Sequence, residues 1–337
     1  MTLRKIGFLH IVPFDRDAPA RGFDEALQLF SYAEELGLDG GWIRTRHLQY
    51  GVSSPAVFLT AAAARTTRID LGVAVIPTAY ESPVRLAEDL ATADLLSGGR
   101  LHPGLSVGAL RHSDAVLSKL FDDPTAIDTS YTHVDRFLSL VRGEPVEQAH
   151  EIGLGGVSES SSDRVEPHSP GLASRISYGA GSVRSAEYAG RAGLDLLVSN
   201  ITTGSQGQTF AEAQREQIDA YRAVRGDGGT VRLGHVLVPT DGTDAARRAR
   251  FEGYVTARTP RTTVQGDGGR LIAEDVSGST AAIVDRLQAD VAFQAVDELL
   301  FELPFQFALD DYRHILSEVA EHIGPALGWS PAIVRSR

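Results

Sequence analysis

The sequence predicts an α/β fold, and within that class a single-domain (β/α)8 TIM barrel with long loop insertions. Eight short segments are rich in apolar residues, and most are followed by a stretch whose apolar residues recur at helical spacing. Near-continuous apolar strands that alternate with helices are typical of a parallel sheet buried on both faces. Eight such units favour a closed barrel over an open doubly wound sheet. The expected strands cover residues 6–11, 41–44, 69–76, 101–107, 176–180, 194–199, 231–238 and 298–303.

The segment after the first strand has the clearest helical pattern. One face of this expected helix carries Phe23, Ala26, Leu27, Phe30, Ala33 and Leu36. Gly37 follows directly, and a glycine at this place is a stop signal for a helix.

Residues 69–107 predict a strand, a helix, a turn and a second strand. Pro77 ends the first apolar run, and helical spacing then continues to Leu95. A Ser-Gly-Gly turn at residues 97–99 precedes the next apolar run. Because consecutive parallel strands need a helical crossover, this stretch predicts one complete unit of a parallel sheet.

Two stretches interrupt the alternation of strands and helices within the single domain expected over residues 1–337. Residues 144–171 are rich in Gly, Ser, Glu and Pro, and residues 256–269 contain several Thr and Gly. Both are predicted to be long loops, which inside a compact domain are usually functional or mobile. Each could cover the top of the barrel or be a solvated insertion without a role.

Composition excludes several classes of function. The chain has no cysteine, which excludes disulfides, thiolate catalysis, iron–sulfur clusters and cysteine zinc sites. Its net charge of −12 disfavours a nucleic-acid-binding surface. The ten histidines are scattered without ligand spacing, so no metal site is expected. No apolar stretch could span a membrane and no signal peptide is recognisable, so we expect a cytoplasmic protein.

The active site of such a barrel lies at the carboxyl ends of its strands. After the fifth expected strand, small residues turn tightly and a helix begins near Ser182, with Ser185 three positions on. Backbone N–H groups at a helix start, two hydroxyls and the positive end of the helix dipole together suit a phosphate. Ser182 could equally be an ordinary N-cap, and the pattern alone leaves both interpretations open.

Residues 76–108 read IPTAYESPVRLAEDLATADLLSGGRLHPGLSVG. This segment closely resembles the third β/α unit of the bacterial luciferase-like flavin-dependent monooxygenase superfamily, whose members share the pattern P, short gap, P-x-R-x-A-E, D-x-x-S-x-G-R, G. The resemblance is strongest over residues 41–108 and 176–201 and weak over 110–175 and 202–296. It implies the TIM barrel and a flavin-dependent oxidoreductase.

The resemblance also implies a cofactor site. Family members hold the flavin 5′-phosphate with hydroxyls after the fifth strand, which corresponds here to Ser182 and Ser185. They place small residues at the end of the third strand, often beside a non-proline cis peptide, and Ala74 matches that position. The implied cofactor-binding residues are Ala74, Val75, Ser106, Gly179, Gly181, Ser182, Val183 and Ser185.

His47 follows the second strand, where the family keeps an acid/base histidine, and it is the implied catalytic residue. The chain departs from the family here, because Arg46 stands where an acidic residue is common. A second departure is Val107, near which bacterial luciferase has a phosphate-binding arginine. His10, Arg46 and Tyr80 are the expected substrate-contacting residues.

The implied activity is that of a two-component monooxygenase. It takes reduced FMN from a separate flavin reductase, reacts with dioxygen and oxygenates a small organic substrate. A homodimer is expected through helices at residues 56–65 and 83–96. Two alternatives stay open, a deazaflavin-dependent reductase or dehydrogenase that transfers hydride, and a non-enzymatic flavin-binding protein. Light emission does not follow from the resemblance.

Overall fold

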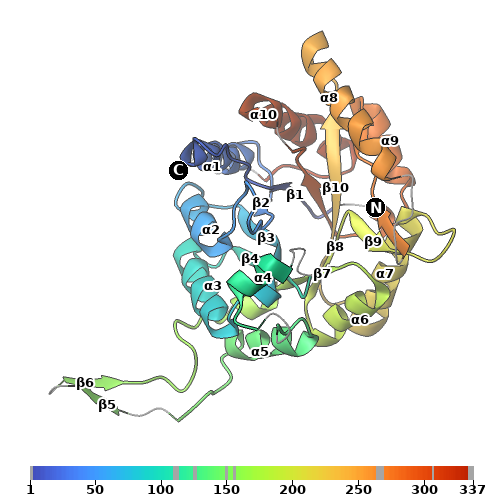
Figure 1. Ribbon diagram of the computed structural model, residues 1–337. Helices are drawn as coiled ribbons and strands as arrows, with labels where there is room; N and C mark the ends of the chain where they lie inside the picture. The colour runs from blue at the N-terminus through green and yellow to red at the C-terminus, as the bar shows by residue number, and fades with distance from the viewer. Residues whose placement is uncertain are drawn as a thin grey trace.

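Eight parallel strands close into a barrel in the computed structural model of this chain, and helices surround it (Figure 1). The structure describes residues 3–108, 114–123, 127–148, 151–154, 157–262, 269–305 and 307–332. The barrel strands are β1 (Lys5–His10), β2 (Gly40–Ile43), β3 (Asp70–Pro77), β4 (Leu101–Ser106), β7 (Ser177–Ala180), β8 (Asp195–Val198), β10 (Val231–Pro239) and β13 (Glu298–Glu302). They pair in that order, and β13 pairs back with β1 to close the ring. The predicted (β/α)8 TIM barrel is therefore confirmed, and each predicted strand overlaps one barrel strand.

Helices follow the strands and form the outer layer (Figure 1). The helices are α1 (Pro19–Glu35), α2 (Pro55–Ala63), α3 (Pro83–Ser97), α4 (Asp114–Leu120), α5 (Tyr131–Val141), α6 (Val183–Ala192), α7 (Phe210–Arg225), α8 (Ala245–Arg258), α9 (Thr280–Ala289), α10 (Leu309–Glu318) and α11 (Gly324–Ala326). Short 3-10 segments lie at Thr78–Tyr80, Leu172–Arg175, Thr259–Arg261 and Phe293–Ala295, and a π segment at Val319–Ile323.

Local sequence explains where the first helices begin and end. Helices α1, α2 and α3 each start with a proline, whose missing N–H has no intrahelical partner at that position anyway. Helix α3 ends at Gly98, whose φ of 72° is left-handed and suits a residue without Cβ. On α1 the predicted inner face is buried against the barrel, and the ring of Phe30 lies 5.0 Å from that of Phe8 in β1.

A tryptophan fills the interior of the barrel. A Cβ atom at Gly7, Gly40 or Gly72 would collide with the indole of Trp42, so glycine in these strands makes room for that ring. Leu9, Leu197 and Leu300 pack with it into a small cluster inside the barrel. The lower part of the barrel is consequently a packed core, and a cavity opens toward the carboxyl ends of the strands.

A buried arginine, Arg232, also lies inside the barrel, next to Trp42. Arg232 in β10 bonds Glu298 from its Nε at 2.6 Å and Asp195 from its Nη1 at 3.1 Å. Its guanidinium also lies 5.9 Å from the centre of the Trp42 ring. The paired carboxylates compensate the cost of burying this cation, because a buried charge without a partner is strongly destabilising.

The first predicted loop, residues 144–171, contains a two-stranded antiparallel hairpin, so the expectation of a loop throughout was wrong. Strands β5 (Glu151–Leu154) and β6 (Val157–Ser160) pair with each other and project away from the barrel beyond α3 and α5 (Figure 1). Each strand has only four residues and lies in a segment rich in Gly, Ser and Glu, so the sequence pattern indicates a loop.

The second predicted loop, residues 256–269, begins inside α8, which continues to Arg258 and is followed by a 3-10 turn. Its residues 263–268 lie outside the described part of the chain. Just beyond, β11 (Arg270–Ile272) pairs antiparallel with β9 (Ile201–Thr203), and β12 (Val276–Gly278) extends the sheet beside β10. These three-residue strands were too short to predict. Within the described residues no helix combines the length and the apolar character needed to cross a membrane.

Candidate active site

A cavity of about 560 Å³ opens at the carboxyl ends of the barrel strands. Its size lies in the range that holds a small organic ligand or cofactor. Seven of the eight predicted cofactor-binding residues line it, namely Ala74, Val75, Ser106, Gly179, Gly181, Ser182 and Ser185. Val183, the eighth, is the first residue of α6 and does not line the cavity.

The end of β3 carries the irregular backbone that the family resemblance implied. The peptide bond between Ala74 and Val75 is cis although neither residue is proline. The pairing of β3 with β4 shifts register between Val73 and Ile76, on either side of this bond. A Cβ atom at Gly179 would lie 2.7 Å from Cγ1 of Val75, so the glycine of β7 provides space for the valine side chain.

The turn from β7 into α6 forms a capping box that also lines the cavity. The Oγ of Ser182 accepts a hydrogen bond from the amide of Ser185 at 3.3 Å, and the Oγ of Ser185 accepts from the amide of Ser182 at 3.0 Å. Ser182 is thus the N-cap of α6. Because it also lines the cavity, its position is compatible with a phosphate-binding role as well. A Cβ atom at Gly181 would have no heavy atom nearer than 3.9 Å, so there is open space at the helix start.

Aromatic residues and one cation stand beside this turn. Tyr131 and Tyr178 line the cavity, and the Tyr178 hydroxyl accepts a hydrogen bond from the amide of Val107 at 3.3 Å. The guanidinium of Arg184 lies 5.9 Å from the centre of the Tyr131 ring. Arg184 therefore places positive charge next to the part of the cavity where Val107 replaces the arginine of bacterial luciferase.

An ion pair also lies in the wall of this cavity. Arg44 donates from Nη2 to Oε1 of Glu302 at 2.8 Å, and Asn200 donates from Nδ2 to Oε2 of the same carboxylate at 2.8 Å. A Cβ atom at Gly234 would lie 3.0 Å from Oε1, so β10 leaves room for the carboxylate. All three polar residues line the cavity. The sequence placed them at strand ends but gave no signal that they form one unit.

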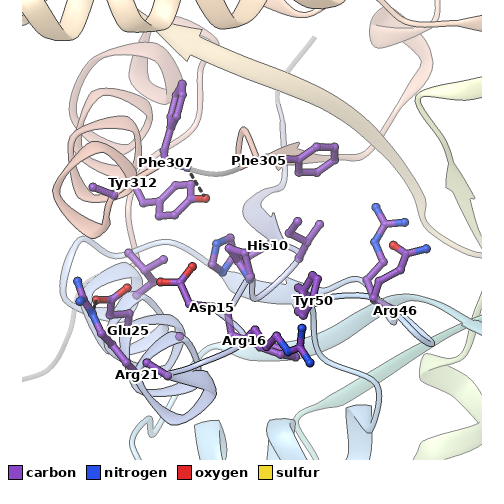
Figure 2. A pocket seen from close by; sticks show the side chains of 18 of the residues that line it. His10, Asp15, Arg16, Arg21, Glu25, Arg46, Tyr50, Phe305, Phe307 and Tyr312 are labelled. Atoms are coloured by element: carbon purple, nitrogen blue, oxygen red, sulfur yellow. Dashed lines mark hydrogen bonds and ion pairs between the residues drawn. The ribbon is translucent and has the colours of Figure 1, made fainter.

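A second and larger cavity, of about 1130 Å³, adjoins the barrel mouth, and two of the predicted substrate residues line it (Figure 2). His10 is 3% exposed, and its ring centre lies 4.7 Å from that of Tyr312. Burial lowers the pKa of His10 to about 3, so its imidazole is neutral near pH 7. Arg46 also lines this cavity, and its guanidinium lies 5.9 Å from the centre of the Phe305 ring.

His47 and Tyr80 lie together but line neither cavity. Their rings are stacked, with centres 4.4 Å apart and planes 17° from parallel. Tyr80 belongs to the 3-10 turn after β3, so this contact joins the loops that follow β2 and β3. The structure therefore brings the predicted catalytic histidine next to Tyr80, whereas His10 and Arg46 line the larger cavity.

Possible ligands of a metal ion among the described residues are the side chains of His, Asp and Glu. Among the side chains that the structure describes, no three His, Asp or Glu residues gather closely enough to hold a metal ion. At the barrel mouth, the carboxylate of Glu302 forms an ion pair with Arg44 and accepts a hydrogen bond from the neutral amide of Asn200.

Comparison with known proteins gives a family. A sequence model described as luciferase-like monooxygenase matches residues 6–295. Limonene 1,2-monooxygenase of Rhodococcus erythropolis is 29% identical over 170 residues, which are 46% of this chain and 42% of that protein. F420-dependent glucose-6-phosphate dehydrogenase of Kineococcus radiotolerans is 36% identical over 105 residues, which are 29% of this chain and 30% of that protein. Each of these relatives is thus matched over less than half of its length.

Among solved structures, the oxygenating constituent of 3,6-diketocamphane monooxygenase from Pseudomonas putida, in complex with FMN, superposes with a TM-score of 0.66. The superposition covers 95% of this chain and 98% of that one, at 16% sequence identity. At this identity the likeness concerns the fold.

Proposed function

The chain belongs to the luciferase-like monooxygenase family, and on that basis we propose that it is a flavin-dependent monooxygenase that uses reduced FMN and dioxygen to oxygenate a small organic substrate. The observation that carries this proposal is the arrangement of the 560 Å³ cavity. The Ser182–Ser185 turn, the cis peptide of β3 and the Arg44–Glu302 pair all line this cavity.

The residues at the start of α6 fit a phosphate group. The first amides of a helix have no intrahelical acceptor and point toward the helix start, where the dipole is positive. Open space at Gly181 gives an anion room, and the Ser182 hydroxyl could donate to it. The Ser185 hydroxyl, which donates to the carbonyl of Ser182 at 2.7 Å, would have to rotate to do so. Ser182 and Ser185 would hold the phosphate of FMN, and Arg184 would add positive charge nearby.

The remainder of the cavity fits a flat ring system. Small residues at Ala74 and Gly179 let a ring approach the backbone of β3 and β7 closely. Leu9, Leu197 and Leu300 form an apolar floor beneath it, which would exclude water from the reacting atoms. Arg44, held by Glu302, would fix the far edge of the ring.

Reduced FMN, when bound, would supply the two electrons that activate dioxygen, so that one oxygen atom enters the substrate and the other leaves as water. The protein residues orient the ring, keep water out and provide hydrogen bonds. His47 is the proposed acid/base group on the loop after β2. A separate flavin reductase is the proposed donor of reduced FMN, and two copies of the chain would form the enzyme.

The second candidate is a deazaflavin-dependent hydride-transfer enzyme. Its support is the similarity to the F420-dependent dehydrogenase of Kineococcus radiotolerans, over 29% of this chain. The same cradle at Ser182 would hold the phosphate of either cofactor, because both interactions depend on the same amides and hydroxyls.

The test is a titration of the purified protein with FMN and, separately, with coenzyme F420, each followed by its change in fluorescence. The complex with reduced FMN, formed without oxygen, is then mixed with dioxygen, and the rate of flavin reoxidation is compared with that of free reduced FMN. We expect tight binding of reduced FMN and a reoxidation time course that differs from that of the free flavin.

Preferential binding of F420 would overturn the monooxygenase proposal in favour of hydride transfer. FMN binding without any change in its reaction with dioxygen would instead indicate a flavin-binding protein that is not an enzyme.

A further inference from the structure

The larger cavity and the flavin cavity meet at the same strand ends but use different residues. In β1, Leu9 lines the 560 Å³ cavity and its neighbour His10 lines the 1130 Å³ cavity. After β2, Thr45 likewise lines the 560 Å³ cavity and its neighbour Arg46 lines the 1130 Å³ cavity. Because successive residues of a strand point to opposite sides, one set of strand ends forms the common wall of both cavities.

The larger cavity lies on the side of the barrel opposite the phosphate cradle. Around the ring, β1 is separated from β7 by the same number of strands in either direction. The cradle follows β7, whereas the larger cavity is built on β1 and the loops after β2 and β13. A flavin held at Ser182 by its phosphate would therefore extend toward the strand ends that border the larger cavity.

Aromatic side chains form much of the wall of this cavity (Figure 2). They are Phe14, Tyr50, Phe305, Phe307 and Tyr312. Phe14 and Tyr50 meet edge to face at 6.0 Å, and at the other side Phe307 lies 6.4 Å from Tyr312. Aromatic rings prefer offset-stacked and edge-to-face partners, so these walls suit a ligand that itself contains rings.

His10 is a buried polar residue in this wall whose ring nitrogens have no hydrogen-bond partner among the described residues. It is 97% buried, and within the described part of the chain neither ring nitrogen has a hydrogen bond. An unsatisfied buried polar group is destabilising, and a ligand hydroxyl or carbonyl oxygen would remove that penalty. A neutral imidazole can donate to such an oxygen or accept from it.

Charge in the wall gives no preference for an ion. The charged lining residues are Asp15, Arg16, Arg21, Glu25 and Arg46, so both signs are present. Arg21 and Glu25 are paired with each other at 2.8 Å. The charges that line the cavity are therefore mixed in sign and do not favour a strongly charged ligand.

We propose that the 1130 Å³ cavity binds a neutral substrate made of fused or linked rings, with a hydroxyl or carbonyl oxygen hydrogen-bonded to His10. This assignment of the substrate class rests on the proposed function, because it takes the flavin ring to lie at the neighbouring wall. Binding of a ligand to this cavity can be measured without turnover of the enzyme.

The test measures binding of simple probes by their fluorescence anisotropy, with saturating oxidised FMN present. The probes are 2-naphthol, naphthalene and naphthalene-2-sulfonate, and 1-decanol is added as an acyclic competitor. We expect 2-naphthol to bind in the presence of FMN, naphthalene-2-sulfonate to bind at least tenfold more weakly, and 1-decanol to compete poorly. In the His10→Phe variant, the preference for 2-naphthol over naphthalene should fall by about fivefold to tenfold, the worth of one hydrogen bond.

The exposed His322, remote from both cavities, supplies a matched control, and His322→Phe should leave the preference unchanged. Displacement of 2-naphthol by FMN would overturn the proposal, because the probe would then occupy the flavin cavity. An unchanged preference in His10→Phe, tighter binding of the sulfonate or equal competition by 1-decanol would also overturn it. FMN binding by the unmodified protein, measured in the same experiment, tests the proposed function separately.

Discussion

Arg44 and Glu302 meet at 2.8 Å across the end of β1, although they stand 258 positions apart in the chain. The carboxylate side chain of Glu302 is 4% exposed and accepts a second hydrogen bond from Asn200. The pair links the loops after β2, β8 and β13 in the cavity wall. Because Arg44, Asn200 and Glu302 lie at the ends of three separate strands, they meet only when the barrel is closed.

Replacing Arg44 by Met should destabilise the fold, because it leaves the buried carboxylate of Glu302 without its cation. We expect the free energy of unfolding in denaturant to fall by about 3 kcal/mol. The Glu302→Gln variant keeps the shape of the side chain and the contact with Asn200, and the Arg44 left without its carboxylate is partly exposed. Its free energy of unfolding should therefore fall by clearly less. Equal stability of Arg44→Met and the unmodified chain would contradict a structural role for the pair.

Replacing both Ser182 and Ser185 by Ala should weaken FMN binding by about 2–3 kcal/mol, because two charge-assisted hydrogen bonds to the phosphate are lost. Loss of the capping box should also lower the stability of the fold by about 1 kcal/mol. Fluorescence titration with FMN measures the first effect and denaturant unfolding the second.

The capping box of α7 provides the control for this experiment. Thr209 and Glu212 make the same reciprocal bonds at the start of that helix, away from the cavity. Thr209→Ala should lower stability without changing the affinity for FMN. If the double serine variant keeps its full affinity, the phosphate assignment is wrong and the serines are caps only.

His47→Ala should fold and bind FMN but lose product formation by about 10²–10⁴-fold, with hydrogen peroxide released in its place, if His47 is the acid/base group. The residue stacks on Tyr80 in a loop and contributes little to the core. Oxygen consumption and peroxide release after mixing with reduced FMN measure the effect. His322→Ala is the control, and normal turnover of His47→Ala would remove His47 from the mechanism.

The protein should be a homodimer through α2 and α3. These helices expose Val57, Val84, Leu95 and Leu96 with fractions from 44% to 71%. Such a patch favours association, and paired copies are the commonest assembly. The Val57→Glu/Leu96→Glu variant should be a monomer by light scattering, whereas Val224→Glu on α7 should behave as the unmodified chain. A monomeric unmodified protein at micromolar concentration would contradict this expectation.

His10 should make the fold less stable as the pH falls below about 6.5. Burial lowers its pKa to about 3, so between these values the unfolded chain takes up a proton that the folded chain does not. The free energy of unfolding should therefore decrease by up to about 1.4 kcal/mol for each pH unit in this window. Denaturant unfolding at pH 6 and pH 4 should show a smaller decrease for His10→Phe, and identical slopes would contradict burial of a neutral His10.

Local sequence patterns were enough to predict the barrel. The eight strands and helix α1 follow from apolar periodicity and from glycine and proline at the ends of elements, and these signals are contained in short windows. The position of the cis peptide was predicted from the family resemblance, and the start of a helix near Ser182 from the small residues and serines at that place. The β5–β6 hairpin was missed because its strands have only four residues each and lie in a segment rich in Gly, Ser and Glu.

The tertiary structure decided how the strand ends are shared between two cavities. Leu9 and His10 are adjacent in sequence, yet one faces the flavin cavity and the other the larger cavity, and only the tilt and closure of the barrel determine which. His47 was predicted to be catalytic and Tyr80 to contact the substrate, and the structure stacks their rings on each other at a place that lines neither cavity. Arg44, Asn200 and Glu302 come together because three distant strands end at one rim, a relation that no local window of the sequence contains.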